Sequence, residues 1–80
     1  MSVTVVFLGP LSDLAGGSAR ELAAPLDWAG LLDTLGPDIA AQLREARVHV
    51  ALNGQVLADK TALAAQDGDE IALLPPVSGG

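Results

Sequence analysis

The chain has 80 residues, which is enough for one hydrophobic core and too few for two, so we expect a single domain. Half of the residues are hydrophobic, and ten acidic against four basic side chains give a net charge of -6. This charge repels nucleic acid and anionic lipid, and with one Trp, one Phe and no Tyr the chain has no platform for stacked bases. The sequence also has no apolar run of membrane-spanning length and no signal-peptide pattern. It therefore predicts a cytoplasmic protein with protein partners and with no nucleic-acid or membrane partner.

The N-terminal part of the sequence predicts two strands separated by a helical turn. Val3–Leu8 is rich in β-branched residues and apolar on both faces, which is typical of a central strand, and Gly9-Pro10 ends it. Pro10 at a first helical position and Gly16-Gly17 at the end bracket a short helical turn. Ser18–Ala24 then predicts a weaker strand at the edge of the sheet.

The middle of the sequence predicts the main helix. Asp27 is a suitable N-cap, and Gly36-Pro37 ends the pattern. Four apolar residues between them have the spacing of one buried helix face: Trp28, Leu31, Leu32 and Leu35. A shorter second helix is expected from Asp38, with Arg44 near its C-terminus, where a cation is favoured.

The C-terminal part predicts a hairpin and a last strand. Val48, Val50 and Leu52 alternate as the inward side of a strand, and Asn53-Gly54 marks a tight turn before Gln55–Leu57. Asp67-Gly68-Asp69 is a polar turn before the final strand, Glu70–Leu74. The order β, β, α, β, β predicts an α+β domain over residues 1–74. We expect a β-grasp arrangement, a mixed sheet of four to five strands with one main helix packed across it.

Residues 75–80 form an unusual end, Pro75-Pro76-Val77-Ser78-Gly79-Gly80. The two prolines provide no N–H donors, so the strand must stop there and the chain leaves in an extended course. Gly79 and Gly80 have no Cβ and can enter a narrow channel. We therefore expect an extended tail in which the carboxylate of Gly80 is the reactive group.

The remaining candidate residues predict no independent catalytic or metal site. The absence of cysteine excludes a disulfide, a thiolate metal site and a cysteine nucleophile. His49, the only histidine, has no partner at metal-ligand spacing, and its strand parity is opposite to that of Val48 and Val50. We expect His49 on the surface or at an interface, and Lys60, the only lysine, as a solvated residue near a turn.

The whole chain resembles the MoaD family, the small subunit of molybdopterin synthase, which comprises ubiquitin-like sulfur carriers related to ThiS. Four features carry the resemblance: the first strand ending at Leu8, the turn at residues 11–16, Asn53-Gly54, and above all residues 67–71 running into Leu74 and the tail. The family often has Arg where Ser12 stands, and aromatic residues where Leu8 and Leu74 stand.

The resemblance implies that an ATP-dependent activating enzyme of the MoeB type adenylates Gly80, which then becomes a thiocarboxylate. An acyl-adenylate has the good leaving group that a carboxylate lacks. The large subunit of molybdopterin synthase is the second implied partner, because it accepts the tail and passes sulfur to the precursor pterin. By this resemblance the chain itself binds no cofactor, and the ATP is used by the activating enzyme. The expected partner-binding residues are Leu8, Leu74, Pro75, Pro76, Val77, Ser78 and Gly79.

The alternation of residues in the first and last strands predicts a docking face. If the helix covers Val5, Phe7, Ile71 and Leu73, the opposite parity leaves an apolar patch on the other side of the sheet. This open-face patch consists of Val6, Leu8, Ala72 and Leu74.

Other functions share the same features. The chain could carry sulfur for the thiamin thiazole or for cysteine synthesis, or it could be a ubiquitin-like modifier that joins Gly80 to lysines of other proteins. A third alternative is an interaction module whose tail has no chemical role. The tail and the extra turn at residues 10–16 favour molybdopterin over the thiamin pathway.

Overall fold

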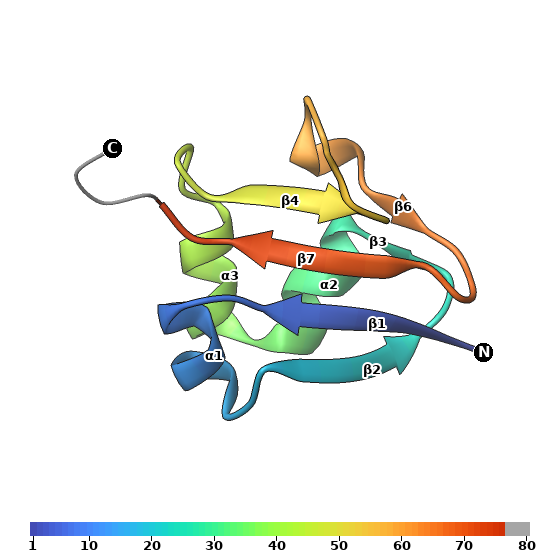
Figure 1. Ribbon diagram of the computed structural model, residues 1–80, viewed down its shortest axis with the longest axis horizontal. Helices are drawn as coiled ribbons and strands as arrows, with labels where there is room; N and C mark the ends of the chain where they lie inside the picture. The colour runs from blue at the N-terminus through green and yellow to red at the C-terminus, as the bar shows by residue number, and fades with distance from the viewer. Residues whose placement is uncertain (77–80) are drawn as a thin grey trace.

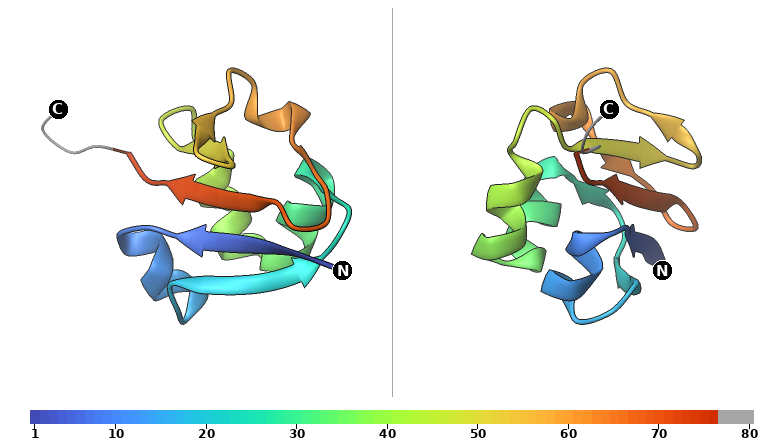
Figure 2. Two further views of the ribbon diagram at one scale, coloured as in Figure 1. Left: turned by 45° about the vertical axis from the view of Figure 1, so that its right-hand side comes forward. Right: turned by 60° about the vertical axis from the view of Figure 1, so that its left-hand side comes forward.

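The computed structural model, which describes residues 1–76, is an α+β fold with helices on one face of a five-stranded mixed sheet (Figures 1 and 2). The strand order is β2-β1-β7-β4-β5, and a separate pair, β3-β6, makes a second small sheet. The elements are β1 (Ser2–Phe7), α1 (Pro10–Ala15), β2 (Ala19–Ala23), β3 (Leu26–Asp27), α2 (Trp28–Leu35), α3 (Pro37–Leu43), β4 (His49–Leu52), β5 (Gln55–Val56), η1 (Lys60–Ala62), β6 (Ala64–Ala65) and β7 (Glu70–Leu74). This is the predicted β-grasp arrangement.

The first and last strands of the chain lie side by side at the centre of the sheet. β1 and β7 are parallel, with Val5 opposite Ile71 and Phe7 opposite Leu73. β2 pairs antiparallel with the outer side of β1, and β4 pairs antiparallel with the outer side of β7. The predicted central position of both apolar strands and the edge position of β2 are therefore confirmed.

Helices α2 and α3 begin and end close to the predicted residues. The Asp27 carboxylate accepts a hydrogen bond from the Gly30 amide at 2.8 Å and so caps α2, which ends at Leu35. Gly36, with a φ of 92°, then redirects the chain into α3. α3 begins at Pro37, one residue before the expected Asp38, because proline is well suited to the first helical position.

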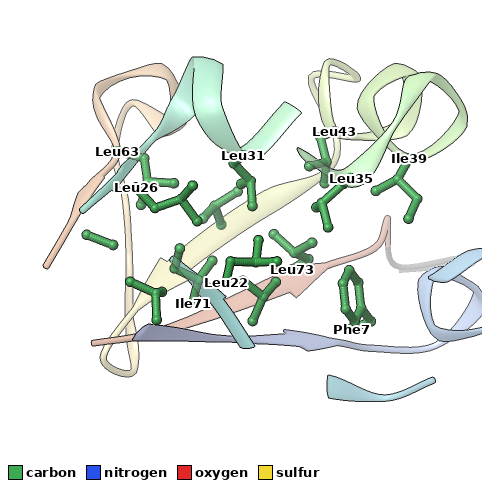
Figure 3. Packing of buried hydrophobic residues seen from close by; sticks show 14 of the residues in the cluster. Phe7, Leu22, Leu26, Leu31, Leu35, Ile39, Leu43, Leu63, Ile71 and Leu73 are labelled. Atoms are coloured by element: carbon green, nitrogen blue, oxygen red, sulfur yellow. The ribbon is translucent and has the colours of Figure 1, made fainter. Parts of the chain in front are cut away.

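The core lies between the sheet and the helices (Figure 3). Leu31 and Leu35 of α2 are buried, whereas Trp28 and Leu32 are only half-buried against the edge of the core. The predicted helix face is confirmed, and Leu31 and Leu35 form its buried part. Among residues 1–76 no polar or charged residue is buried. The fully buried side chains with the largest volumes are Phe7, Leu31, Leu43, Ile71, Leu73, Val3, Val5, Val48 and Val50.

The two turns predicted from Asn53-Gly54 and Asp67-Gly68-Asp69 are joined by side-chain hydrogen bonds. The Asn53 amide donates to the Asp69 carboxylate at 3.0 Å, and the Asn53 side-chain oxygen accepts from the Glu70 amide at 2.9 Å. The Asp69 carboxylate also accepts from the Gln66 amide at 2.8 Å. The β4–β5 hairpin is thereby fixed to the start of β7.

These bonds make stability depend on the charge of Asp69. Hydrogen bonds from the Gln66 amide and then from the Asn53 side chain lower the pKa of Asp69 below its ordinary value. The folded pKa is thus below the unfolded one, so the stabilisation is present above the unfolded pKa and is lost as pH falls through the folded pKa. We expect Asp69→Asn to be less stable than the parent near pH 7 and to show a flatter decline below about pH 4.

Urea unfolding of both proteins over a pH series measures this effect. Asp13→Asn, at an exposed position on α1, serves as the control for removing one negative charge. Parallel pH profiles for the parent and Asp69→Asn would contradict the assigned role of Asp69.

Candidate functional site

The predicted reactive tail begins where the central strand β7 ends. β7 stops at Leu74, and Pro75 and Pro76 follow it without strand pairing. Val77, Ser78, Gly79 and Gly80, including the expected reactive carboxylate, lie outside the described residues. The structure thus shows the base of the tail, formed by Leu74, Pro75 and Pro76, and the surfaces around it.

One side of the tail base contacts the turn that follows β1. Gly9 has a φ of 57° and a ψ of −136°, a backbone conformation that L side chains rarely adopt. A Cβ at this position would lie 3.2 Å from Cγ of Pro75. The backbone amide of Leu8 also donates to the carbonyl of Leu73 at 3.4 Å. The exit of β1 therefore packs directly on the exit of β7.

We expect an alanine Cβ at position 9 to displace Pro75, and the variant Gly9→Ala therefore to slow the reaction that the resemblance implies for Gly80. The control is Gly16→Ala, which also places alanine at a positive φ, 75°, but has no atom within 4 Å of the new Cβ. Both variants should lose some stability, whereas only Gly9→Ala should slow the adenylation of Gly80 that the family resemblance implies. Gly9→Ala in a Pro75→Ala background should lower the rate less than it does in the parent, because the contact with Pro75 is then absent. An equal loss in both backgrounds would assign the effect to backbone strain alone.

The other side of the tail base is the open face of the sheet. Leu8 is 39% exposed, and Val6, Ala72 and Leu74 are half-buried, while their neighbours of opposite parity are in the core. The predicted orientation of the open-face patch is therefore confirmed. Its role in binding stays a prediction.

Cross-strand pairing extends the open-face patch to two elements that the sequence did not associate with it. His49 of β4 lies opposite Leu74, and Ala51 lies between Ala72 and Val56 of β5. Val56 is 54% exposed, and His49 is exposed as expected. Strand alternation in β4 and β5 indicated which residues point outward, but the register beside β7 was needed to place them next to Leu74.

A groove also lies beside the tail base, between α1, α3 and the prolines. It has a volume of about 390 Å³ and is lined by Pro10, Leu11, Asp13, Leu14, Gln42, Pro75 and Pro76. Leu14 is 51% exposed at this surface. The tail base is thus flanked by apolar surface on both sides.

Within residues 1–76, no three His, Asp or Glu side chains are grouped so that they could hold a metal ion. In the same part of the chain, none of the helices has the length and apolar character needed to cross a membrane.

The prediction that Lys60 is a solvated surface residue is wrong. Its side chain is half-buried, and Nζ donates to the carbonyl oxygens of Val48, at 2.6 Å, and Glu45. Nζ also lies 6.0 Å from the centroid of the Trp28 ring. Burial lowers the pKa of Lys60, and the nearby charge of Glu45 partly opposes this shift. The partners of Lys60 are mainly backbone groups, which leave no signal in the sequence.

A comparison with known protein families shows which family this chain belongs to. The model of the ThiS family matches residues 5–80, nearly the whole chain and including the tail. The chain belongs to the ThiS family. The fold is that of the ubiquitin-like sulfur carriers, as the resemblance implied. No curated protein sequence shows detectable similarity to this ThiS family member.

Several solved structures are similar to this ThiS family member along its whole length. One chain in the complex of subunits 1 and 2 of molybdopterin-converting factor from Helicobacter pylori is 30% identical to this chain. All of both chains is covered, and the TM-score is 0.67. The crystal structure of SAMP1 from Haloferax volcanii is 28% identical, again with all of both chains covered and a TM-score of 0.71. A second Haloferax volcanii protein, solved in solution, is 26% identical over all of this chain and 87% of that one, with a TM-score of 0.78.

Proposed function

We propose that this protein is a sulfur carrier of molybdenum cofactor biosynthesis, and that the C-terminal Gly80 carries the sulfur as a thiocarboxylate. The observation that carries the proposal is the family match through residue 80, together with a tail base that leaves the central strand beside an exposed apolar face. The identity of 30% with a chain of the molybdopterin-converting factor complex favours this pathway.

The proposed reaction begins at the Gly80 carboxylate. Its oxygen attacks the α-phosphorus of ATP in an activating enzyme of the MoeB type, and pyrophosphate leaves. Hydrosulfide then attacks the acyl carbon and forms the C–S bond, the C–O bond to phosphate breaks, and AMP leaves with the electron pair, so that the product is a thiocarboxylate. This protein supplies the acyl group, and its partners supply the acid–base groups.

The proposed second partner is a large subunit of molybdopterin synthase, in which the thiocarboxylate gives its sulfur to the precursor pterin. Contacts to both partners are assigned to the open-face patch, especially Leu8 and Leu74, and to the tail residues Pro75, Pro76, Val77, Ser78 and Gly79. Because the apolar open-face patch lies beside the base of the tail, one partner could bind the domain and the tail together.

A protein modifier is the second candidate, because SAMP1, a small archaeal modifier protein, has a similar fold and is 28% identical to this chain. Mass spectrometry of the protein from its native cells distinguishes the two functions. Exchange of a terminal oxygen for sulfur supports the carrier, whereas Gly80 joined to lysines of other proteins supports the modifier. The absence of both would leave only an interaction module and would overturn the proposal.

The docking role of the open-face patch has a direct test. We expect Leu8→Asp and Leu74→Asp to weaken binding to the large subunit by about tenfold or more, because a charge would be buried in an apolar interface. Ala29→Asp is the control, since Ala29 is exposed on α2, on the helical side of the sheet. Calorimetric titration measures the affinities, and thermal melting confirms that all three variants fold. Parent-like affinity of both leucine variants would contradict the assignment.

A further inference from the structure

Lys60 is the only lysine of the chain, and its side chain is half-buried. Two of its hydrogen bonds go to the carbonyls of Glu45 and Val48, in the connection between α3 and β4, and the Trp28 ring lies beside it. We call these three groups together with Lys60 the lysine clamp. A lysine side chain in this place satisfies carbonyls that follow the C-terminus of α3.

The lysine clamp matters because of the proposed function, on which this inference rests. Activation turns Gly80 into an acyl-adenylate, which reacts with amines as well as with sulfur. In that side reaction the lone pair of a neutral amine forms a C–N bond to the acyl carbon. The C–O bond to phosphate breaks, AMP leaves with the electron pair, and the amine proton passes to solvent. An accessible lysine on a second copy would therefore consume the activated carrier.

We propose that the lysine clamp shields Lys60 from acylation, so that copies of this carrier do not become joined to one another through lysine. Attack requires the Nζ lone pair to reach within about 3 Å of the acyl carbon, along a direction free of other atoms. In the clamp, Nζ must first leave both carbonyls and the Trp28 ring. The protection is therefore one of position, because the lowered pKa of Lys60 by itself makes the neutral amine more abundant.

Competitive acylation of the folded protein tests the clamp without any partner. In Arg47→Lys, a second lysine is introduced at an exposed position of the same connection, so both amines meet the same reagent in the same molecule. After brief treatment with the N-hydroxysuccinimide ester of acetic acid near pH 8, peptide mass spectrometry gives the extent of acetylation at each position. We expect Lys60 to react roughly tenfold or more slowly than the introduced lysine, since its reaction requires local opening.

The same labelling in guanidinium chloride provides the reference state. There the two lysines should react at similar rates, which would assign the difference to the fold. Equal rates in the folded protein would overturn the proposal. So would a slow reaction of Lys60 that persists after unfolding, because the cause would then be local sequence.

A second experiment adds an activating enzyme of the MoeB type, ATP and Mg²⁺. The parent should form no lysine-linked dimer, whereas Arg47→Lys should form dimers joined from Gly80 to the introduced lysine. Dimers joined through Lys60 in the parent would overturn the inference. If neither protein is adenylated, the proposed function fails, and the labelling experiment still decides whether Lys60 is shielded.

Discussion

Replacing Gly79 by Val is expected to abolish thiocarboxylate formation while leaving the melting temperature unchanged. In the proposed function, a β-branched side chain next to the reacting carboxylate would widen the tail that has to enter a narrow channel of the partner. Deleting Gly80 should have the same result for a different reason. It shortens the reach of the tail by at most about 3.6 Å, which is more than the alignment of a reacting centre tolerates.

Mass spectrometry and ATP-dependent adenylation assays measure both effects with the matched partners. Ala29→Asp is the control, since Ala29 is exposed on α2 and is not among the residues assigned to partner binding. Full sulfur transfer by the Gly80 deletion would show that the tail has no chemical role, and the carrier function would have to be abandoned.

Truncating Leu31 to Ala is expected to lower the free energy of unfolding by about 2 to 5 kcal/mol. Leu31 has an exposed fraction of 0% and lies at the centre of the α2 face that packs on the sheet, so the truncation leaves a cavity. This is a large part of the stability available to so small a domain. Leu32→Ala is the matched control, because it makes the same chemical change one position away at a half-buried site.

Urea unfolding of the two variants compares the positions directly. Leu32→Ala should cost clearly less than Leu31→Ala, about 1 kcal/mol, since its side chain keeps contact with solvent. The reverse order would mean that α2 is rotated about its axis relative to the structure described above.

The main elements were predictable because their signals are local. The apolar composition of Val3–Leu8 and Glu70–Leu74 predicted two central strands, and Asp27 predicted the start of α2. The parity of residues in β1 and β7 likewise predicted which side chains form the open-face patch. Each of these inferences depends on spacing within a short segment, and hydrophobic periodicity is strongest there.

What was missed depends on pairings between distant segments. β3 and β6 have two residues each and are recognisable only because Leu26 lies opposite Ala65. The bonds between Asn53 and Asp69 join two turns that the sequence presented as separate. The position of Lys60 was even harder to predict. Its ammonium group binds backbone carbonyls, which every residue type has, so these partners leave no signature in the sequence.

The parallel pairing of β1 and β7 also determines how the sheet resists a force that pulls on the C-terminal tail. The N-terminal end of β1 and the C-terminal end of β7 lie at opposite ends of the sheet (Figure 1). A force that draws the tail away from the domain therefore acts along β7 and shears it against β1 and β4. The hydrogen bonds of both ladders then carry the force together, instead of breaking one after another as when a strand is peeled from its end. In the proposed function, this geometry lets the domain stay folded while a partner binds and releases the tail.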